Sequence, residues 1–125
     1  MWVTFFLVGL GGGLGAALRH GMNLGLLRLA GAWLPWGTLG ANVVGSFALG
    51  WLMEAATGVR WLGVDLRLVL GTGLLGGFTT YSSFNLETIR LLQQGAVGRA
   101  VLYLAVTLLL CLGAGVLGIR AGQRL

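Results

Sequence analysis

An apolar stretch in the middle of the chain contains residues that a membrane-crossing helix rarely tolerates. The segment from Leu66 to Leu92 is mostly apolar, but its centre, from Gly71 to Phe84, reads GTGLLGGFTTYSSF. In hydrocarbon an unpaired backbone amide or carbonyl costs several kcal/mol, so a spanning helix normally bonds all its backbone groups internally. Paired glycines followed by threonines therefore predict a helix that breaks inside the membrane, with freed backbone groups facing a partner, an ion or a water-filled cavity.

The second half of this broken helix is expected to begin near Thr79. A threonine hydroxyl can cap the freed amides at a helix start. The positive end of the helix would then point inward, and such an end favours anions. The break thus predicts a binding or permeation site.

The composition places the chain in a membrane. Of 125 residues, 57% are hydrophobic and only 9% are charged, whereas about a quarter of the residues of a soluble domain are charged. At about 20 residues per crossing, four helices with short connections use nearly the whole length. We therefore expect one all-α domain, residues 1–125, with spans at about 2–27, 36–56, 66–93 and 99–120. The basic residues stand singly, without the continuous stripe that nucleic acid requires, so no nucleic-acid partner is expected.

The first span is rich in glycine and carries a charge near its end. Gly9 with Gly13, and Gly11 with Gly15, are small residues one helical turn apart. In lipid such pairs let helix backbones approach closely, so they predict tight packing. Arg19 follows within apolar sequence. Because a charge inside a membrane is costly, Arg19 is expected to reach water or a protein partner, or to snorkel to the interface.

Two predicted spans carry polar side chains at every fourth position, which places each set on one helix face. The sets are Thr38, Asn42 and Ser46 in the second span, and Tyr103, Thr107 and Cys111 in the fourth. A carboxamide at bilayer depth needs hydrogen-bond partners, and the amide of Asn42 can donate either to a neighbouring helix or to an anion. Two such stripes in one small protein predict a narrow wet path.

Aromatic and polar side chains share the helix that follows the break. Tyr81 and Phe84 are three residues apart and lie on one side of it. Such pairs usually serve packing, yet ring edges carry partial positive charge and can line an anion path. Glu87 could pair with Arg90 or hydrogen-bond Ser83, and either contact would be structural.

Three motifs follow one another over most of the chain. They are GGGLGAALRH from Gly11, GTLGANVVGSFALG from Gly37 and GGFTTYSSFNLET from Gly76. In order, spacing and four-span length they resemble the small bacterial fluoride channels called Fluc or CrcB proteins. The resemblance implies a channel that exports fluoride passively across the cytoplasmic membrane and gives fluoride resistance. It also implies a lipid-embedded homodimer of two antiparallel copies, with two fluoride paths and a structural sodium ion at the broken helices.

The resemblance also implies residue roles. Asn42 matches the pore asparagine, Phe84 matches the second pore phenylalanine, and Tyr81 replaces the first. The backbone carbonyls of Gly76 and Thr79 match the sodium ligands. The other expected site positions are Thr38, Ser46 and Ser83 on the path, Tyr103 and Thr107 on a hydroxyl track that Cys111 would continue, and Arg19 and Glu87 at the vestibule.

The alternative function is a small dual-topology, proton-coupled transporter. Those exchangers need a membrane-embedded carboxylate in the first span, and span 2–27 has none. A packing subunit of a larger complex would show small-residue seams but not aligned polar stripes. An enzyme is not expected, because His20 is the only histidine and no nucleophile lies at a spacing that commits it to catalysis. With Cys111 as the only cysteine, neither an intramolecular disulfide nor a cysteine metal cluster can form.

Overall fold

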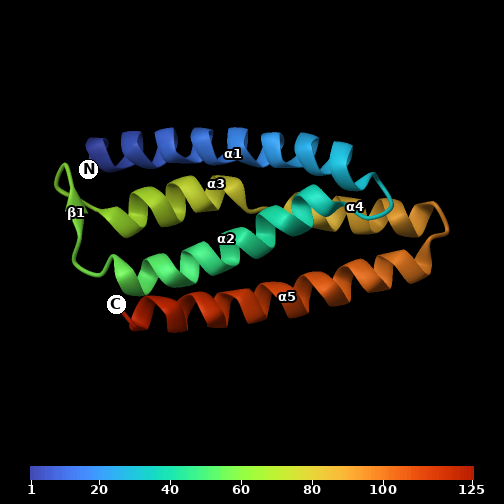
Figure 1. Ribbon diagram of the computed structural model, residues 1–125. Coiled ribbons are helices and arrows are strands. Elements are labelled where there is room, and N and C mark those ends of the chain that lie inside the picture. The colour runs from blue at the N-terminus through green and yellow to red at the C-terminus, as the bar shows by residue number, and fades with distance from the viewer.

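The computed structural model describes residues 1–125 and is helical along most of its length. The helices are α1 (Trp2–Ala30), α2 (Trp36–Ala55), π-helix η1 (Leu68–Leu75), α3 (Gly76–Phe78), α4 (Tyr81–Gln93) and α5 (Val97–Gln123). Figure 1 shows α1, α2 and α5 running side by side, with α3 and α4 following one another end to end beside them. Both termini and the β1 hairpin lie at one end, and the α1–α2 and α4–α5 connections lie at the opposite end. By length and composition, α1 and α5 can each cross a membrane. The architecture fits an all-α membrane protein, as the sequence predicts.

The first two helices are bounded by a glycine and a proline. α1 continues to Ala30, three residues past the expected end of the first span, and Gly31 stops it with a φ of 77°. Pro35 immediately precedes α2, and its carbonyl accepts from the amide of Leu39 at 3.1 Å. A proline needs no amide partner, so it suits the start of a helix. The predicted start of this helix at Trp36 is confirmed.

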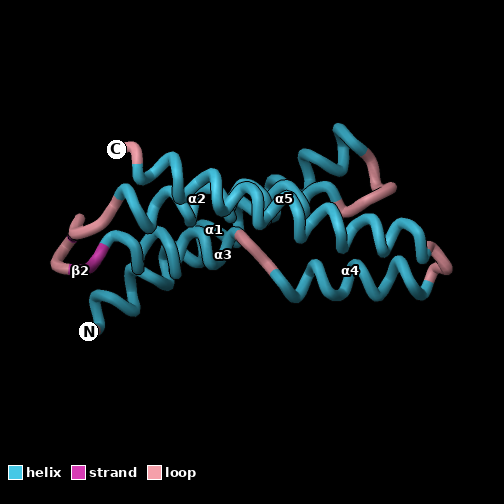
Figure 2. Tube along the Cα trace, turned by 90° about the horizontal axis from the view of Figure 1, so that it is seen from below, coloured by secondary structure: helices cyan, strands magenta, loops and turns pink.

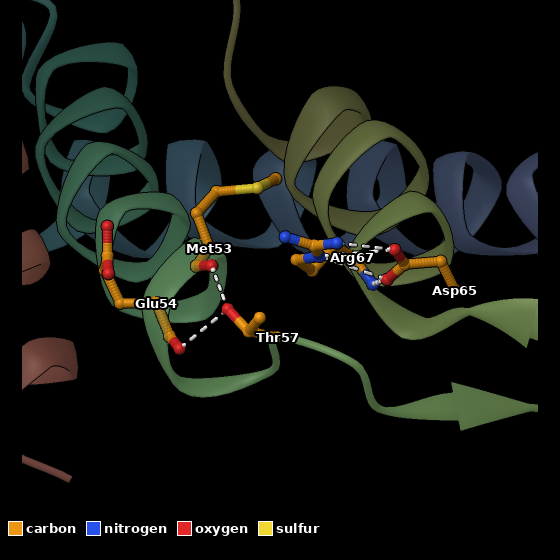
Figure 3. A network of polar contacts seen from close by, with 5 residues as sticks. All are labelled: Met53, Glu54, Thr57, Asp65 and Arg67. Carbon is orange, nitrogen blue, oxygen red and sulfur yellow. Dashed lines mark hydrogen bonds and ion pairs between the residues drawn. The ribbon is translucent and has the colours of Figure 1, made fainter.

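The connection between α2 and η1 contains a small hairpin that the sequence did not predict. β1 (Arg60–Trp61) pairs antiparallel with β2 (Val64–Asp65). The tight turn places Gly63 at a φ of 78°. Figure 3 shows the polar contacts beside it, where Nη2 of Arg67 lies 2.8 Å from Oδ2 of Asp65. The hydrogen bond from Arg67 lowers the pKa of Asp65 to about 2.

α1 packs closely against η1 and α3 through one of its two glycine pairs. A Cβ on Gly11 would lie 2.8 Å from the Val69 carbonyl oxygen, and one on Gly15 would overlap the Leu74 carbonyl oxygen. Gly9 and Gly13, by contrast, have no atom within 4 Å of such a Cβ. Close packing is therefore confirmed for Gly11 and Gly15, while Gly9 and Gly13 lie on the open face of α1.

α2 and α5 lie side by side at equally close range (Figures 1 and 2). A Cβ on Gly50 would come within 2.6 Å of the Gly115 carbonyl oxygen, and one on Gly122 within 2.7 Å of the Trp51 carbonyl oxygen. Gly50 therefore allows the backbones of α2 and α5 to pack closely. The contact fixes the polar stripes of the two helices relative to each other.

The break in the third helix lies at two threonines. Thr79 and Thr80 are extended, with ψ values of 157° and 127°, and Figure 2 shows their segment linking α3 to α4. The sequence predicts the break in this region, with the second half beginning near Thr79, and the structure opens the chain at the threonines while Gly76 and Gly77 are helical. Gly77 serves packing, because a Cβ there would overlap the Gly12 carbonyl oxygen. The wider π-helix η1 precedes the break, and such turns are frequent at functional sites.

Candidate functional site

Asn42 on α2 bonds to the broken segment through both ends of its amide. Its Nδ2 donates to the Thr80 carbonyl at 3.0 Å, and the Thr80 amide donates to its Oδ1 at 2.8 Å. The two bonds together fix which side-chain atom is nitrogen. The second N–H of the carboxamide is not used in either bond. Asn42 thus links α2 to the broken segment and still has one N–H donor free for another acceptor.

The start of α4 is capped by Thr80 rather than by Thr79. The Ser83 amide donates to Oγ1 of Thr80 at 3.2 Å. Oγ1 of Thr79 instead donates to the Leu75 carbonyl at 2.9 Å, so it completes the end of the preceding helix. The prediction of Thr79 as the cap is therefore wrong by one residue. The reason is that the Thr79 amide still donates to the Leu75 carbonyl at 2.9 Å, which brings the Thr79 hydroxyl to the same carbonyl before the chain turns extended.

Two carbonyls near the break lack the amide that a continuous helix would supply. The regular partner of the Gly76 carbonyl is the Thr80 amide, which is bonded to Asn42 instead. The Thr79 carbonyl accepts no hydrogen bond from a backbone amide of the turns and caps. Gly76 is exposed on the surface of the protein. Carbonyl oxygens of this kind are ligands for hard cations.

A cavity of about 360 Å³ lies between α2, α4, α5 and the break. Its lining residues are Asn42, Ser46, Thr79, Thr80, Tyr81, Phe84, Thr107, Leu108, Cys111 and Leu112. None of them carries a charge at neutral pH. The hydroxyl of Thr107 is buried without a hydrogen-bond partner, although its side chain lines this space. The structure therefore brings parts of both polar stripes to one cavity.

Phe84 forms one wall of this cavity and is held between two tyrosines. Its ring centroid lies 6.0 Å from that of Tyr81 and 5.1 Å from that of Tyr103. Phe84 is buried, whereas the Tyr81 side chain is 77% exposed. The two rings predicted as an aromatic pair thus differ: one is fixed by packing, and the other lies open to its surroundings.

Glu87 is held by hydroxyls from two other helices. Oγ1 of Thr38 donates to its Oε1 at 2.6 Å, and the hydroxyl of Tyr103 donates to its Oε2 at 3.3 Å. The predicted contacts of Glu87 with Arg90 or Ser83 are absent. The carboxylate reaches across to α2 and α5 instead of along its own helix, because strong donors lie there.

Glu87 also borders a second cavity of about 490 Å³, together with Thr38 and Arg90. Thr38 and Tyr103 therefore do not share the first cavity with Asn42. Ser83 lines neither cavity. Arg19 is half-buried on α1, takes part in none of the hydrogen bonds or ion pairs, and does not meet Glu87.

Comparison with known proteins identifies the family. The model of the family described as CrcB-like protein, Camphor Resistance (CrcB), matches residues 6–119. The chain belongs to the CrcB-like family. The matched region of this CrcB-like protein contains both cavities and the break between α3 and α4.

Similar proteins cover almost the whole CrcB-like chain. A Sorangium cellulosum protein named fluoride-specific ion channel FluC is 47% identical over 97% of this chain and 95% of its own length. Proteins of the same name from Beijerinckia indica and Agrobacterium fabrum are 49% and 39% identical, over 95% and 98% of this chain. They cover 95% and 98% of their own lengths.

Sequence reasoning left out one polar residue of the CrcB-like site, Thr80. Its backbone meets Asn42 and its hydroxyl caps α4. The signal that could have found it is a threonine three residues before Ser83, directly before a helical run, which is typical of a helix start. Leu108 and Leu112, which also line the cavity, follow from the four-residue spacing of α5.

Proposed function

We propose that this CrcB-like protein is a fluoride-selective channel. The relatives named as fluoride-specific ion channels cover nearly the whole chain, which supports the same activity here. The observation that carries the proposal is the free hydroxyl of Thr107 in an uncharged cavity that also contains Asn42. Fluoride is a small and strong hydrogen-bond acceptor. Neutral donors in a space of low dielectric can replace part of its hydration without holding it too tightly to leave.

In this proposal the anion passes along donors from three helices. The free N–H of Asn42 and the hydroxyls of Ser46 and Thr107 donate to it, while the ring edges of Phe84 and Tyr81 face it. Ring edges carry partial positive charge and so suit an anion. Thr38, Ser83 and Tyr103 would belong to the approach, with Glu87 and Arg19 near its entrance.

Conduction is proposed to be passive. Proton coupling requires a carboxylate that can load and release a proton at the transport site. α4 carries one carboxylate, Glu87, and both of its oxygens accept hydrogen bonds. No acidic side chain lines the cavity around Asn42. Fluoride would therefore flow down its own gradient, out of the cell across the cytoplasmic membrane.

The proposed assembly is an antiparallel homodimer in lipid with the helix break at mid-membrane. Gly76 lies on the protein surface, and the carbonyls of Gly76 and Thr79 lack helical amide partners. Oxygens of this kind fit a hard monovalent cation such as sodium, which would be held where two breaks meet. When bound, the cation supplies positive charge that offsets the repulsion between nearby anions. It would be structural and not transported.

Fluoride efflux from liposomes tests the function directly. Purified protein is reconstituted, and the release of fluoride and of chloride is measured with ion-selective electrodes, with and without a proton gradient. We expect fluoride release without a proton gradient and far slower chloride release. Equal release of the two anions, or release of fluoride only with a proton gradient, contradicts the proposal.

A further inference from the structure

Cys111 is a thiol inside the cavity rather than on the lipid-facing side of α5. It lies four residues after Thr107, so the two side chains share one helix face, and both line the cavity with Asn42 and Ser46. The thiol is half-buried and makes no disulfide. It is also the only cysteine in the chain. Any thiol chemistry of this protein therefore takes place in the cavity.

The neighbouring Thr107 shows that this part of the cavity can accept a ligand. The Thr107 residue is 6% exposed, and its hydroxyl has no hydrogen-bond partner within the protein. A buried polar group normally finds a partner, because an unmet one costs free energy. The free hydroxyl beside a thiol therefore indicates space that an ion or a small molecule can occupy.

We propose that Cys111 is a binding site for soft, thiophilic cations, of which the methylmercuric ion is the simplest probe. Thiolate sulfur selects soft metals over the hard cations that prefer oxygen. In the reaction the S–H bond breaks, a sulfur–mercury bond forms, and the proton leaves to water: R–SH and CH3Hg⁺ give R–S–HgCH3 and H⁺. Mercury keeps its oxidation state, so no oxidant or reductant is needed.

Occupation of Cys111 closes the cavity to anions, a step that rests on the proposed function. The adduct is neutral, so it attracts no anion of its own. It places a metal and a methyl group one helical turn from the Thr107 hydroxyl and across from Ser46. This covers donors that the path uses and replaces a polar surface by an apolar one. Apolar constrictions are sufficient to stop ion flow in channels.

The test combines the mass of the protein with its transport. Intact protein in liposomes is treated with methylmercuric nitrate in chloride-free buffer, and its mass and fluoride efflux are measured before and after. Each protein is compared with its own rate before treatment. The matched variants are Cys111→Ser, which removes the thiol, and Leu109→Cys in the Cys111→Ser background. Leu109 lies on the same helix but is 71% exposed and outside the cavity.

We expect one methylmercury adduct on the wild-type protein and loss of its fluoride efflux to the rate of protein-free liposomes. Cys111→Ser should gain no mass and keep its own rate, and the Leu109→Cys protein should gain the adduct and keep its rate. A wild-type protein that resists labelling until it is denatured overturns the site. Labelling without loss of efflux, or loss in the Cys111→Ser protein, overturns the block. If no variant transports fluoride before treatment, the proposed function fails, and the adduct mass still decides whether Cys111 binds the metal.

Discussion

Asn42 and Thr80 exchange two hydrogen bonds across the helix break, at 3.0 Å and 2.8 Å. In an unbroken helix the Thr80 amide would bond to the carbonyl of Gly76. The side chain of Asn42 takes that amide instead and also bonds to the Thr80 carbonyl. One residue on α2 thus stabilises the break and leaves the Gly76 carbonyl without its helical partner. Position 42 is therefore both structural and part of the proposed path.

Asn42→Asp should abolish fluoride transport in a protein that still folds. The aspartate can accept from the Thr80 amide, but it has no donor for the Thr80 carbonyl or for an anion. Its negative charge also repels fluoride strongly in a site of low dielectric. Losing the bond to the Thr80 carbonyl should lower the free energy of unfolding by about 1–3 kcal/mol. Liposome efflux, size-exclusion profile and thermal midpoint are the measurements.

The control for this substitution is Asn85→Asp. Asn85 lies on the exposed side of α4 and lines neither cavity. The Asn85→Asp substitution adds the same negative charge away from the proposed path, so fluoride efflux should be largely retained. Transport near the wild-type rate in a folded Asn42→Asp protein would remove Asn42 from the path.

Thr38→Val should destabilise the protein more than Tyr103→Phe does. The Thr38 hydroxyl bonds to Glu87 at 2.6 Å, while the Tyr103 hydroxyl does so at 3.3 Å. Valine keeps the shape of threonine but leaves a half-buried carboxylate with one donor fewer. A hydrogen bond to a charged group contributes about 1.5–3 kcal/mol, and the shorter bond should lie at the upper end. Denaturation midpoints in detergent measure the order.

Thr57→Val serves as the control for the hydroxyl change. The Thr57 hydroxyl is exposed and bonds to the backbone of Met53 and Glu54 (Figure 3). An exposed substitution of this kind should change stability by no more than about 0.5 kcal/mol. If Thr57→Val proves as damaging as Thr38→Val, the bonds to Glu87 are not what stabilises this region.

Gly15→Ala should prevent correct packing of α1, whereas Gly13→Ala should be tolerated. A methyl group at position 15 would overlap the Leu74 carbonyl oxygen, which is backbone and cannot move aside cheaply. A methyl group at position 13 meets nothing within 4 Å, and alanine favours a helix over glycine by about 1 kcal/mol. Yield of folded protein and thermal midpoint distinguish the two. Equal behaviour of the two variants would contradict the close contact of α1 with η1.

The helices and the polar stripes could be read from the sequence, but the contacts between helices could not. Four-residue spacing was sufficient to place Thr107 and Cys111 on one face of α5 with the polar side toward the protein. The same spacing cannot say that Thr38 meets Glu87 while Asn42 meets Thr80, because partner choice depends on how α2 and α4 are aligned in space. For this reason the predicted contacts of Glu87 along its own helix were wrong.

The position of the break shows a similar limit. Both the glycine pair and the threonines that follow it are weak helix formers, so the sequence alone predicts an interruption among Gly76, Gly77, Thr79 and Thr80 without choosing between them. Close contact with α1 keeps Gly77 helical, since only a residue without a side chain fits there. The chain opens two residues later, at Thr79 and Thr80, where Asn42 supplies the missing bonds. The position of the break therefore depends on contacts with α1 and with Asn42, which local helix preference does not include.

The contribution of Asp65 to stability should be independent of pH between about 7 and 5. Arg67 lowers the pKa of Asp65 from its ordinary value of 3.8 to about 2. A carboxylate whose folded-state pKa is lowered stabilises the protein above its unfolded pKa and loses this effect as pH falls through the folded one. Asp65→Asn should therefore lower the thermal midpoint equally at pH 7 and pH 5, and by less at pH 3. A difference that grows toward pH 3 would contradict the pair.

The last prediction concerns orientation in the membrane and starts from the arginines. Both termini and the hairpin lie at one end of the helix bundle, and the α1–α2 and α4–α5 connections lie at the opposite end (Figure 1). The first end carries Arg60, Arg67, Arg120 and Arg124, and the second carries Arg28, Arg90 and Arg99, with Arg19 half-buried on α1. An excess of basic residues in short loops sets orientation. Because the two ends carry nearly equal numbers of arginines, charge does not favour one orientation, and we expect both orientations to occur.

Added charge should break this tie and reveal whether two orientations are needed. Two or three lysines after Leu125 should direct that end to the cytoplasm, and the biased protein expressed alone should lose fluoride efflux, because antiparallel pairs can no longer form. A second copy, biased the opposite way by lysines in the connection between Gln93 and Val97, should be inactive alone and should restore efflux when the two are coexpressed. The mirrored variant controls for damage by the lysines themselves, since both copies carry added charge in the active mixture. Full efflux from either biased protein by itself would show that one orientation is sufficient and would overturn the antiparallel dimer.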